Sequence, residues 1–427
     1  MAVAEASTAD PEHEKKLLRR FFIVWTAQAF SLVGSGVVQF ALVWWLTIDT
    51  GSATVLALAM MAAMLPQVVG GPFVGPLVDR WNRRHVMVAA DTGIAVVTLV
   101  LILLFIAGAV EVWHVFVAMA LRGVGGAFHW PAMAASTSLM VPKRHMTRVG
   151  GLNQAVNGVV GIVAPALAAA MIVFLPMEWV LSVDIVTAAI AVAPLLFIMI
   201  PQPTADDSGP AKSPSVLREM REGFTFLKAW PGMVAFLLLI IPINMVFAPA
   251  GALMPIFVTE YFHEGVEELA MIEISFGASF IIGGVVLGIW GGTKRKMYTI
   301  LGGGVVSGLA GVGVGLVPPD LFVLALFWFF VTGFSVAVLN GCAMGVMQNA
   351  IRADMQGRVF ALVGSVTMAM SPIGLLIAGP VADAVGVSLW FVMAGVVTTG
   401  LMLLGFMMPS VVKLEDRIVE QTTVEEK

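Results

Sequence analysis

Cysteine and charge are both scarce in this sequence. Cys342 is the only cysteine among 427 residues, which excludes a disulfide framework and a multi-cysteine metal site. Charged residues make up 12% of the chain, about half the share of a typical soluble domain. The formal net charge is −4, so nucleic acid is not an expected partner. The chain therefore has too little polar surface to cover a water-soluble globule.

Motifs for catalysis are also missing. The sequence contains no G-x4-G-K-[ST] phosphate loop, no H-E-x-x-H metal motif among its six histidines and no G-x-S-x-G nucleophile elbow. We therefore expect no enzymatic activity, no bound metal and no cofactor. Without ATP hydrolysis, any energy that the protein uses must come from an ion gradient, most simply the proton gradient.

Long apolar runs occupy most of the chain. Hydrophobic residues account for 59% of it and the mean hydropathy is +0.96, while about 20 apolar residues are enough to cross the bilayer core. The first run is too long for a cleaved secretory signal, so we expect it to remain as a membrane helix. The sequence predicts an all-α membrane protein with twelve transmembrane helices at residues 21–48, 53–78, 85–109, 113–140, 149–175, 178–200, 231–258, 269–291, 297–317, 320–349, 357–382 and 387–409.

Basic residues support this arrangement of spans. All but one of the 23 Lys and Arg residues lie at the two ends or in alternate intervals between spans, counting Arg358 at the first turn of its span, and Arg122 is the exception. The remaining intervals carry acids instead, among them Glu178, Glu264 and Asp383. Cytoplasmic loops are enriched in Lys and Arg. We therefore expect both termini in the cytoplasm and the protein in a bacterial inner membrane, as a multi-pass monomer.

A polar interval divides the spans six and six. We expect a cytoplasmic segment at 1–20, a six-helix bundle at 21–200, a cytoplasmic linker at 201–230, a second six-helix bundle at 231–409 and a cytoplasmic tail at 410–427. Within the linker, residues 216–230 have the pattern of an amphipathic helix on the membrane surface. Gly71-x3-Gly75 and Gly284-x3-Gly288 stand at corresponding places in the two halves, which indicates pseudo-symmetric repeats.

The loop between the second and third spans carries a family signature. The run Gly75-Pro-Leu-Val-Asp79-Arg80-Trp-Asn-Arg83-Arg84 resembles the G-x-L-x-D-R-x-x-R-R/K pattern of the major facilitator superfamily, in the place where that pattern is expected. Arg122-x3-Gly126 resembles the superfamily's motif B, and Gly158-x2-Gly161-x2-Ala164-Pro165 is a degenerate form of its antiporter motif C. The resemblance implies two six-helix bundles that rock about a central substrate site.

Finer similarity extends over most of the chain to the drug:proton antiporter branch that includes Mef-type macrolide efflux proteins. It rests on segments such as Trp25-Thr26-Ala27-Gln28-Ala29 and Pro372-Ile373-Gly374-Leu375. The resemblance implies export of a small amphipathic organic substrate by alternating access and proton-coupled antiport, with the lipid bilayer as surroundings, and hence antibiotic resistance. A siderophore, lipid or metabolite transporter of the same fold stays an alternative, and so does, with less support, a non-transporting membrane receptor.

The same resemblance implies a cytoplasmic latch. A carboxylate is stabilised beside a helix N-terminus and beside guanidinium groups, so we expect Asp79 to cap the helix that starts near Gly357 when the cytoplasmic side is closed. The alternative is an ordinary turn-forming Asp in a basic loop. The expected latch residues are Gly75, Asp79, Arg80, Arg83, Arg84, Asp91, Gly357 and Arg358.

Ionisable residues inside the spans cost about 2.5–3.5 kcal/mol each on insertion scales, so they are candidates for function. Arg122 lies deep in the fourth span, and Asp184 in the sixth is its best partner by depth. The two act either in coupling or as a static buried pair. Glu273 binds a substrate amine, carries the transported proton or merely reaches water at the outer side. His129 is either a titrating group or a packed side chain.

Amide side chains in the spans complete the set of candidates. Such groups either line a polar cavity or bridge helices, and the sequence does not decide between these roles. The six are Gln28, Gln39, Asn153, Asn157, Asn244 and Asn340.

Overall fold

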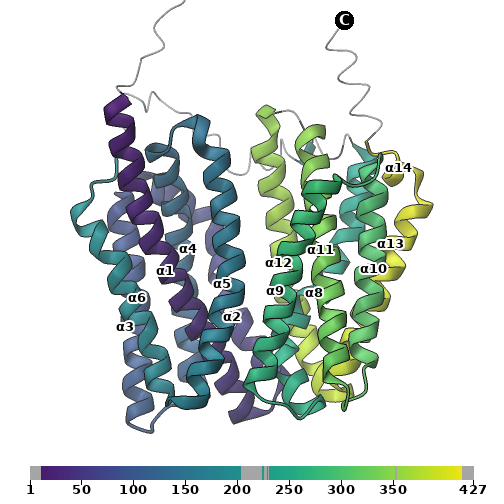
Figure 1. Ribbon diagram of the computed structural model, residues 1–427, viewed down its shortest axis with the longest axis horizontal. Coiled ribbons are helices and arrows are strands. Elements are labelled where there is room, and N and C mark those ends of the chain that lie inside the picture. The colour runs from purple at the N-terminus through teal and green to yellow at the C-terminus, as the bar shows by residue number, and fades with distance from the viewer. Residues whose placement is uncertain (1–10, 203–223, 226–227, 229, 352, 416–427) are drawn as a thin grey trace, which may run out of the picture.

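The computed structural model describes residues 11–202, 224–225, 228, 230–351 and 353–415. In this part of the chain the regular structure is helical throughout (Figure 1). The long helices are α1 (Pro11–Thr50), α2 (Ala53–Arg80), α3 (Arg83–Ile106), α4 (Val112–Met140), α5 (Met146–Phe174), α6 (Met177–Phe197), α8 (Pro231–Ile256), α9 (Val266–Trp290), α10 (Lys296–Leu316), α11 (Phe322–Ala350), α12 (Ala353–Val385) and α13 (Val387–Met407). Short turns of 3-10 helix at Lys143–His145, π-helix at Phe257–Tyr261 and α-helix at Pro409–Val412 (α14) complete them.

These twelve long helices coincide with the twelve predicted spans, and the prediction of an all-α membrane fold is confirmed. Of the described helices, eleven are apolar and long enough to cross a membrane by length and composition alone. The one that falls short is α4, because Arg122, His114 and His129 interrupt its apolar sequence. It packs against α2 and α3 inside the first bundle nonetheless. Polar residues, rather than short length, set this helix apart.

Two predicted boundaries need comment. We expected residues 1–20 to be a separate segment, but α1 starts at Pro11 and continues unbroken through that stretch into the membrane span. The amphipathic helix expected at 216–230 lies largely outside the described residues. Helix ends elsewhere follow local signals: Ser52 accepts a hydrogen bond from the Val55 amide at the start of α2, and Gly291 adopts a φ of 72° at the end of α9.

The helices form two groups, α1–α6 and α8–α13, that repeat one packing pattern (Figure 1). In the first group α1 packs on α5 and α6, α2 on α4, and α3 on α4 and α6. In the second, α8 packs on α12 and α13, α9 on α11, and α10 on α11 and α13. The contacts between the groups correspond as well, because α2 meets α12 and α5 meets α9. The fold is therefore pseudo-symmetric, as the repeated sequence motifs indicate.

Glycines allow the closest of these helix crossings. A Cβ atom built on Gly308 of α10 would lie 2.4 Å from Thr399 Oγ1 of α13. One built on Gly379 of α12 would lie 2.7 Å from the Cα of Thr54, at the start of α2. Small residues let backbones approach closely in lipid, where dispersion contacts replace the hydrophobic drive of water.

The two groups are closed against each other at the end away from the chain termini. There the carboxylate of Asp383, near the end of α12, accepts hydrogen bonds from Ser52 Oγ (3.1 Å), the Ala53 amide (2.8 Å), the Thr54 amide (3.0 Å) and Thr54 Oγ1 (2.5 Å). A carboxylate at this position also complements the partial positive charge of the α2 N-terminus. Asp383 of one group thus caps a helix of the other.

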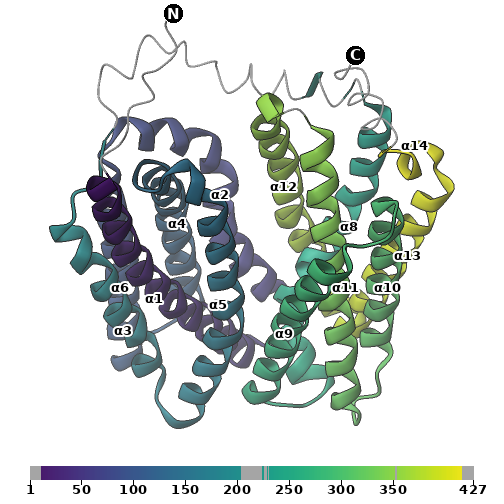
Figure 2. The same cartoon turned by 45° about the horizontal axis from the view of Figure 1, so that its top comes forward.

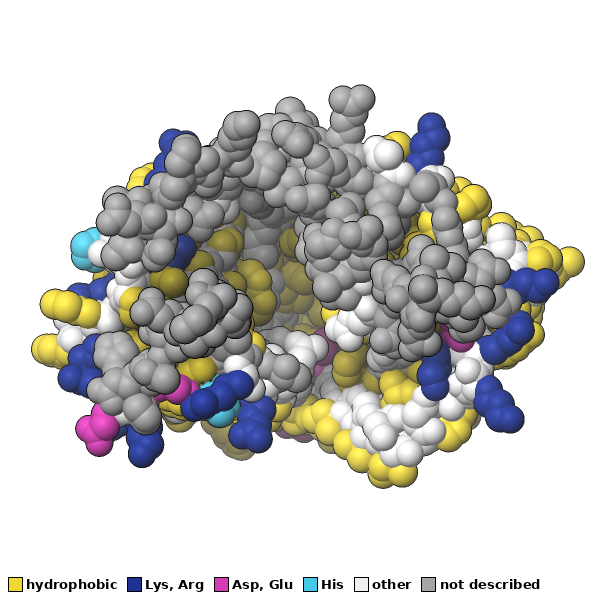
Figure 3. Space-filling model, turned by 90° about the horizontal axis from the view of Figure 1, so that it is seen from above, with side chains coloured by type: hydrophobic (Ala, Val, Ile, Leu, Met, Phe, Trp, Pro, Cys, Tyr) yellow, Lys and Arg dark blue, Asp and Glu magenta, His cyan; other side chains and the backbone are white. Residues whose placement is uncertain are grey.

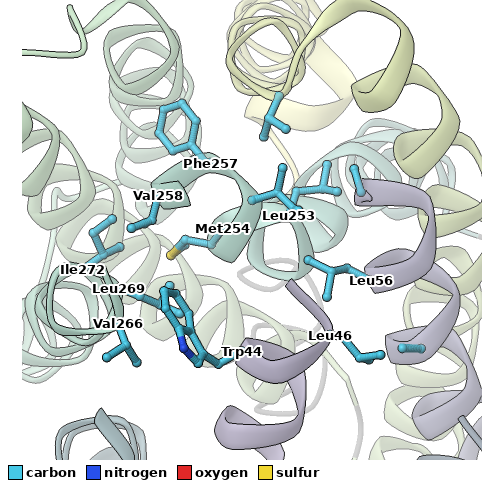
Figure 4. Close-up of a cluster of buried hydrophobic side chains, with 14 of the residues drawn as sticks. Trp44, Leu46, Leu56, Leu253, Met254, Phe257, Val258, Val266, Leu269 and Ile272 are labelled. Atoms are coloured by element: carbon cyan, nitrogen blue, oxygen red, sulfur yellow. The ribbon is translucent and has the colours of Figure 1, made fainter. Parts of the chain in front are cut away.

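A hydrophobic cluster lies beneath this cap. Its side chains come from both groups and point toward one another in Figure 4. They include Trp44, Leu46, Leu56, Leu253, Met254, Phe257, Val258, Val266, Leu269 and Ile272. Most are fully buried, Leu46, Leu56, Leu253 and Phe257 among them at 0% exposure, so this end excludes water as well as being capped.

The end that carries both termini differs from the closed end. The groups diverge there in the ribbon view (Figure 2), and the space-filling view from that end shows a hollow lined by hydrophobic side chains, with Lys and Arg around the rim (Figure 3). The shape is that of a two-bundle molecule sealed at one end and open at the other.

The Asp383 cap generates a first prediction. Asp383→Ala removes every hydrogen bond of the cap, a loss of about 1 kcal/mol or more for an N-cap, and should loosen the closed end. In a Cys342→Ser background, a cysteine at buried Leu56 should then react with a maleimide roughly 5-fold faster or more. Asp320→Ala is the matched control, because Asp320 is an exposed acid in the α10–α11 loop. Equal labelling rates in both variants would show that the cap does not hold this end closed.

Candidate functional site

A buried ion pair joins four helices of the first bundle. The Arg122 guanidinium of α4 contacts the Asp184 carboxylate of α6, and the two side chains are 8% and 1% exposed. Thr98 of α3 donates to Asp184 Oδ2 at 2.7 Å and accepts from Arg122 Nη1 at 2.6 Å. Ser35 of α1 donates to Asp184 Oδ1 at 3.0 Å. Both charges therefore have partners, as burial of charge requires.

Arg122 and Asp184, which we predicted to be partners because they lie at similar depth in the membrane, are thus in contact. The sequence left open whether the pair couples transport or is static. Because Asp184 is fully surrounded by donors from three other helices, we interpret the pair as the frame of the first bundle. Arg122 also lines a cavity, so its outer face adjoins the site described next.

A second polar cluster contains Asp91 of α3, Gln28 of α1 and His129 of α4. Gln28 Nε2 donates to Asp91 Oδ2 at 2.9 Å. His129 Nε2 lies 3.0 Å from Gln28 Oε1 and 3.4 Å from Asp91 Oδ1. Both neighbouring atoms are acceptors, so Nε2 of His129 carries a hydrogen. The Asp91 side chain is only 5% exposed.

Asp91 has partners within the first bundle. We expected it to belong to the cytoplasmic latch because it lies near the inner end of its span. Its described contacts are with Gln28 and His129, because its face of α3 turns toward α1 and α4. The side chains of Asp79 and Arg358 lie outside the described residues, so the part of Asp91 in the latch stays a prediction.

A cavity of about 210 Å³ lies between the two polar clusters. Its polar lining combines members of both clusters with other side chains from α1 and α2: Gln28, Ser31, Ser35, Gln39, Gln67, Asp91, Arg122 and His129. A second cavity of about 80 Å³ adjoins Gln28 and His129 on another side and includes Trp25, Asn153 and Asn157. Trp25 Nε1 donates to Asn153 Oδ1 at 2.7 Å. The first bundle therefore holds a continuous set of polar side chains inside an apolar wall.

Four of the six amide candidates belong to these cavities, and two do not. Gln28, Gln39, Asn153 and Asn157 line them. Asn244 donates to the Ile240 carbonyl of its own helix at 3.0 Å, and Asn340 is exposed on α11.

Gln67, Ser35 and Thr98 were not among the predicted site residues. Gln67 stands alone in the apolar run of α2, and the cost of placing an amide in lipid was a usable signal for it. The hydroxyl side chains of Ser35 and Thr98 gave no such signal, because Ser and Thr are common in membrane helices, where they often form hydrogen bonds with their own backbone.

Only part of the expected latch is described. Gly75 is half-buried on α2, and Arg80 is exposed at its end. Asn82 caps α3 by accepting from the Arg84 amide at 3.1 Å, while the Arg84 side chain donates to the Leu196 carbonyl at the end of α6. Arg83 is 7% exposed. The side chains of Asp79 and Arg358, and the surroundings of Gly357, lie outside the described residues, so the latch stays a prediction.

Glu273 lies apart from the polar clusters. It is half-buried on α9 in the second bundle and lines a largely apolar cavity of about 140 Å³. The cavities of the two halves thus differ in chemistry although the halves share one packing pattern: among the described residues, Asp91, Arg122 and His129 line the cavity of the first, and Glu273 lies among aromatic rings in that of the second.

Comparison with known proteins agrees with this geometry. Residues 24–375 match the sequence profile of the Major Facilitator Superfamily. Macrolide efflux protein A of Streptococcus pyogenes is 33% identical over 376 residues, covering 88% of this chain and 92% of that protein. Multidrug efflux pump Tap of Mycolicibacterium fortuitum is 26% identical over 389 residues, covering 88% and 91%.

A solved structure supports the same fold. A bacterial homologue of the human lysosomal transporter Spinster, in an inward-facing and unoccupied conformation, superimposes with a TM-score of 0.66 at 12% identity and covers 96% of this chain and 99% of that one. At this level of identity the likeness concerns the fold.

The buried ion pair generates a second prediction. Arg122→Ala leaves the Asp184 carboxylate buried without its counter-charge, which costs about 3–5 kcal/mol, so the melting temperature of the purified protein should fall sharply. Arg122→Met combined with Asp184→Leu removes both charges and should recover most of the loss. Intrinsic tryptophan fluorescence during heating measures both. An Arg122→Ala protein as stable as the unmodified protein would contradict the role of the pair as a frame.

Proposed function

The chain belongs to the major facilitator superfamily, and from this premise we propose that it exports amphipathic organic compounds of the macrolide type by proton-coupled alternating access. It is a multi-pass membrane transporter and not an enzyme. Its relatives are bacterial efflux proteins, in keeping with a place in the inner membrane. The substrate, the coupling ion and the transport cycle are the subject of the proposal.

The observation that carries the proposal is the titratable cluster on the wall of a cavity in the first bundle. Asp91 and His129 face the same polar cavity, and the molecule is sealed at one end and open at the other. Histidine is the side chain whose charge ordinarily changes between pH 5 and 8. A carboxylate that shares a hydrogen-bond network with it can release a proton when substrate binds and take one up when the bundles rock. The similarity to macrolide efflux protein A supports the substrate class.

The pairing of α2 with α12 supports alternating access. The two helices run antiparallel and pack against each other. Asp383, near the end of α12, caps the start of α2 at the closed end. Asp79, near the end of α2, stands at the place in sequence from which it would cap the start of α12 when the other end closes. We propose that the two caps form in turn, one in each state of the cycle.

Gradient-driven uptake into inverted membrane vesicles tests the function. A radiolabelled macrolide should accumulate when a proton gradient is imposed, and the accumulation should collapse when a protonophore dissipates it. Expression in a pump-deficient host should raise the inhibitory concentration of the same compound. Accumulation of a siderophore or a lipid, with no macrolide uptake, would favour the alternative substrates. Binding without flux would favour a receptor.

Asp91→Asn tests the coupling site. An amide keeps a hydrogen bond to Gln28 but cannot release a proton, so accumulation driven by the gradient should fall at least tenfold while exchange of labelled for unlabelled substrate persists. Exchange needs rocking of the loaded protein but no net proton movement. Asp320→Asn serves as the control for an exposed acid. Normal accumulation by well-expressed Asp91→Asn protein would place the coupling proton elsewhere.

Asp79→Ala tests the expected cytoplasmic latch. If Asp79 caps α12 when the cytoplasmic side is closed, its loss should favour the conformation seen here, reduce export and leave labelling at position 56 as slow as in the parent. Asp383→Ala should shift the same equilibrium the other way. Unchanged transport by well-expressed Asp79→Ala protein would argue against the latch.

A further inference from the structure

The cavity in the second bundle is bounded by five helices, α8, α9, α10, α11 and α13. Its volume of about 140 Å³ lies below the several hundred Å³ that a whole drug-sized ligand occupies. Met254 and Phe391, which line it, also belong to the hydrophobic cluster of the closed end. The cavity therefore lies directly under the seal and has room for one chemical group of a larger molecule.

Two polar groups line the cavity without partners. Among the described residues, none forms a hydrogen bond or an ion pair with the Glu273 carboxylate, whereas Asp91 and Asp184 have both. The Thr398 side chain of α13 is 4% exposed, and its Oγ1 has no hydrogen-bond partner. A carboxylate with no counter-charge in a largely apolar lining indicates a cationic ligand that would pair with it.

Aromatic rings form much of the remaining wall. Phe276 lies one turn from Glu273 on α9, while Phe329 of α11 and Phe391 of α13 meet edge to face with centroids 6.0 Å apart. Ring faces attract a cation that lies within about 6 Å. A carboxylate among such rings matches the charge and the apolar surface of an alkylammonium group.

An inorganic cation fits this lining poorly. Calcium takes six to eight oxygen ligands, and magnesium takes six, several of them water. The cavity offers the Glu273 carboxylate and few hydroxyls, and the hydroxyl of Thr332 is already donated to the Trp328 carbonyl at 2.9 Å. A methylated ammonium group needs no such shell, because its charge is spread over methyl groups that pack against rings.

Gly251 provides an entrance on α8. It is exposed, and a Cβ atom built on it would meet nothing within 4 Å. The α8 helix also contacts α1 and α2 of the first bundle, so this wall faces the space between the halves. A headgroup can enter here while the rest of its molecule stays between the bundles.

We propose that Glu273, with the rings of Phe276, Phe329 and Phe391, binds the alkylammonium group of the transported compound. The proposal rests on the proposed function and adds to it: the preferred substrates are amphiphiles that carry a tertiary or quaternary amine. Glu273 is then a substrate-binding residue of the second bundle, and proton exchange belongs to the Asp91 and His129 cluster of the first.

A pair of isosteric probes tests this assignment. An aryl compound with a trimethylammonium head and the same compound with a tert-butyl head have nearly the same shape and differ in charge, and the quaternary nitrogen has no proton to lose. Binding of each labelled probe to protein in lipid nanodiscs gives the two affinities. The unmodified protein should bind the cation roughly tenfold more tightly or better, and Glu273→Gln should bind both alike. Phe329→Leu should weaken binding of the cation several-fold and leave the neutral probe unchanged.

Controls separate this proposal from the function on which it rests. Glu267→Gln removes an exposed acid from the start of the same helix and should keep the preference for the cation. A Glu273→Gln protein that still prefers the cation overturns the proposal, whatever the vesicles show. A Glu273→Gln protein that binds each probe as tightly as the unmodified protein does, and yet loses gradient-driven uptake of both, would make Glu273 a coupling residue. That result also overturns the proposal. Absence of any driven uptake by the unmodified protein would overturn the proposed function, and the binding data would still test the cavity.

Discussion

The burial of a guanidinium and a carboxylate in the middle of a membrane bundle is the constraint on which the first half of the structure depends. Each charge costs about 2.5–3.5 kcal/mol to place in a membrane helix, and the cost is offset only if every remaining donor and acceptor is satisfied. Thr98 bridges Arg122 and Asp184, and Ser35 donates to Asp184, so α1, α3, α4 and α6 are joined at one level. The polar cluster of Asp91, Gln28 and His129 lies beside this pair and shares a cavity with Arg122.

The halves of the molecule have the same scaffold but differ in the polar groups that line their cavities. The main helix contacts in the first bundle have counterparts in the second, and so do the contacts of α2 with α12 and α5 with α9 across the interface. The polar chemistry has no such counterpart, because the second bundle places one carboxylate among rings and glycines where the first has paired acids and amides. A protein that moves a proton and an amphiphile in opposite directions benefits from this separation, since each ligand then meets a surface suited to it.

A feature of the structure could be predicted from the sequence where its physical cause acts within one segment of the chain. Hydropathy and the distribution of Lys and Arg were enough for the twelve helices, because burial in lipid acts on each segment by itself. The estimated depth of each residue in the membrane also identified Asp184 as the partner of Arg122. The contacts of Asp91 with Gln28 and His129 were not predicted, because helix rotation is set by packing and not by position along the helix. Asp383 was read only as an acid of an outer loop, since its partners at residues 52–54 are 329 to 331 positions away in the chain. The lining of the Glu273 cavity was out of reach for the same reason: it draws on five helices.

The antiparallel contact of α2 with α12 has a consequence for the energetics of transport. Helix caps contribute about 0.5–2 kcal/mol each, so breaking one while forming another of the same kind nearly balances. In the proposed cycle, the two conformations of the empty protein would therefore differ by little free energy, and a ligand would need only a modest preference for one of them to change their populations. A carrier with such a balance uses little of the free energy of the proton gradient for its own conformational change. Most of that free energy is then available to concentrate the substrate on one side of the membrane.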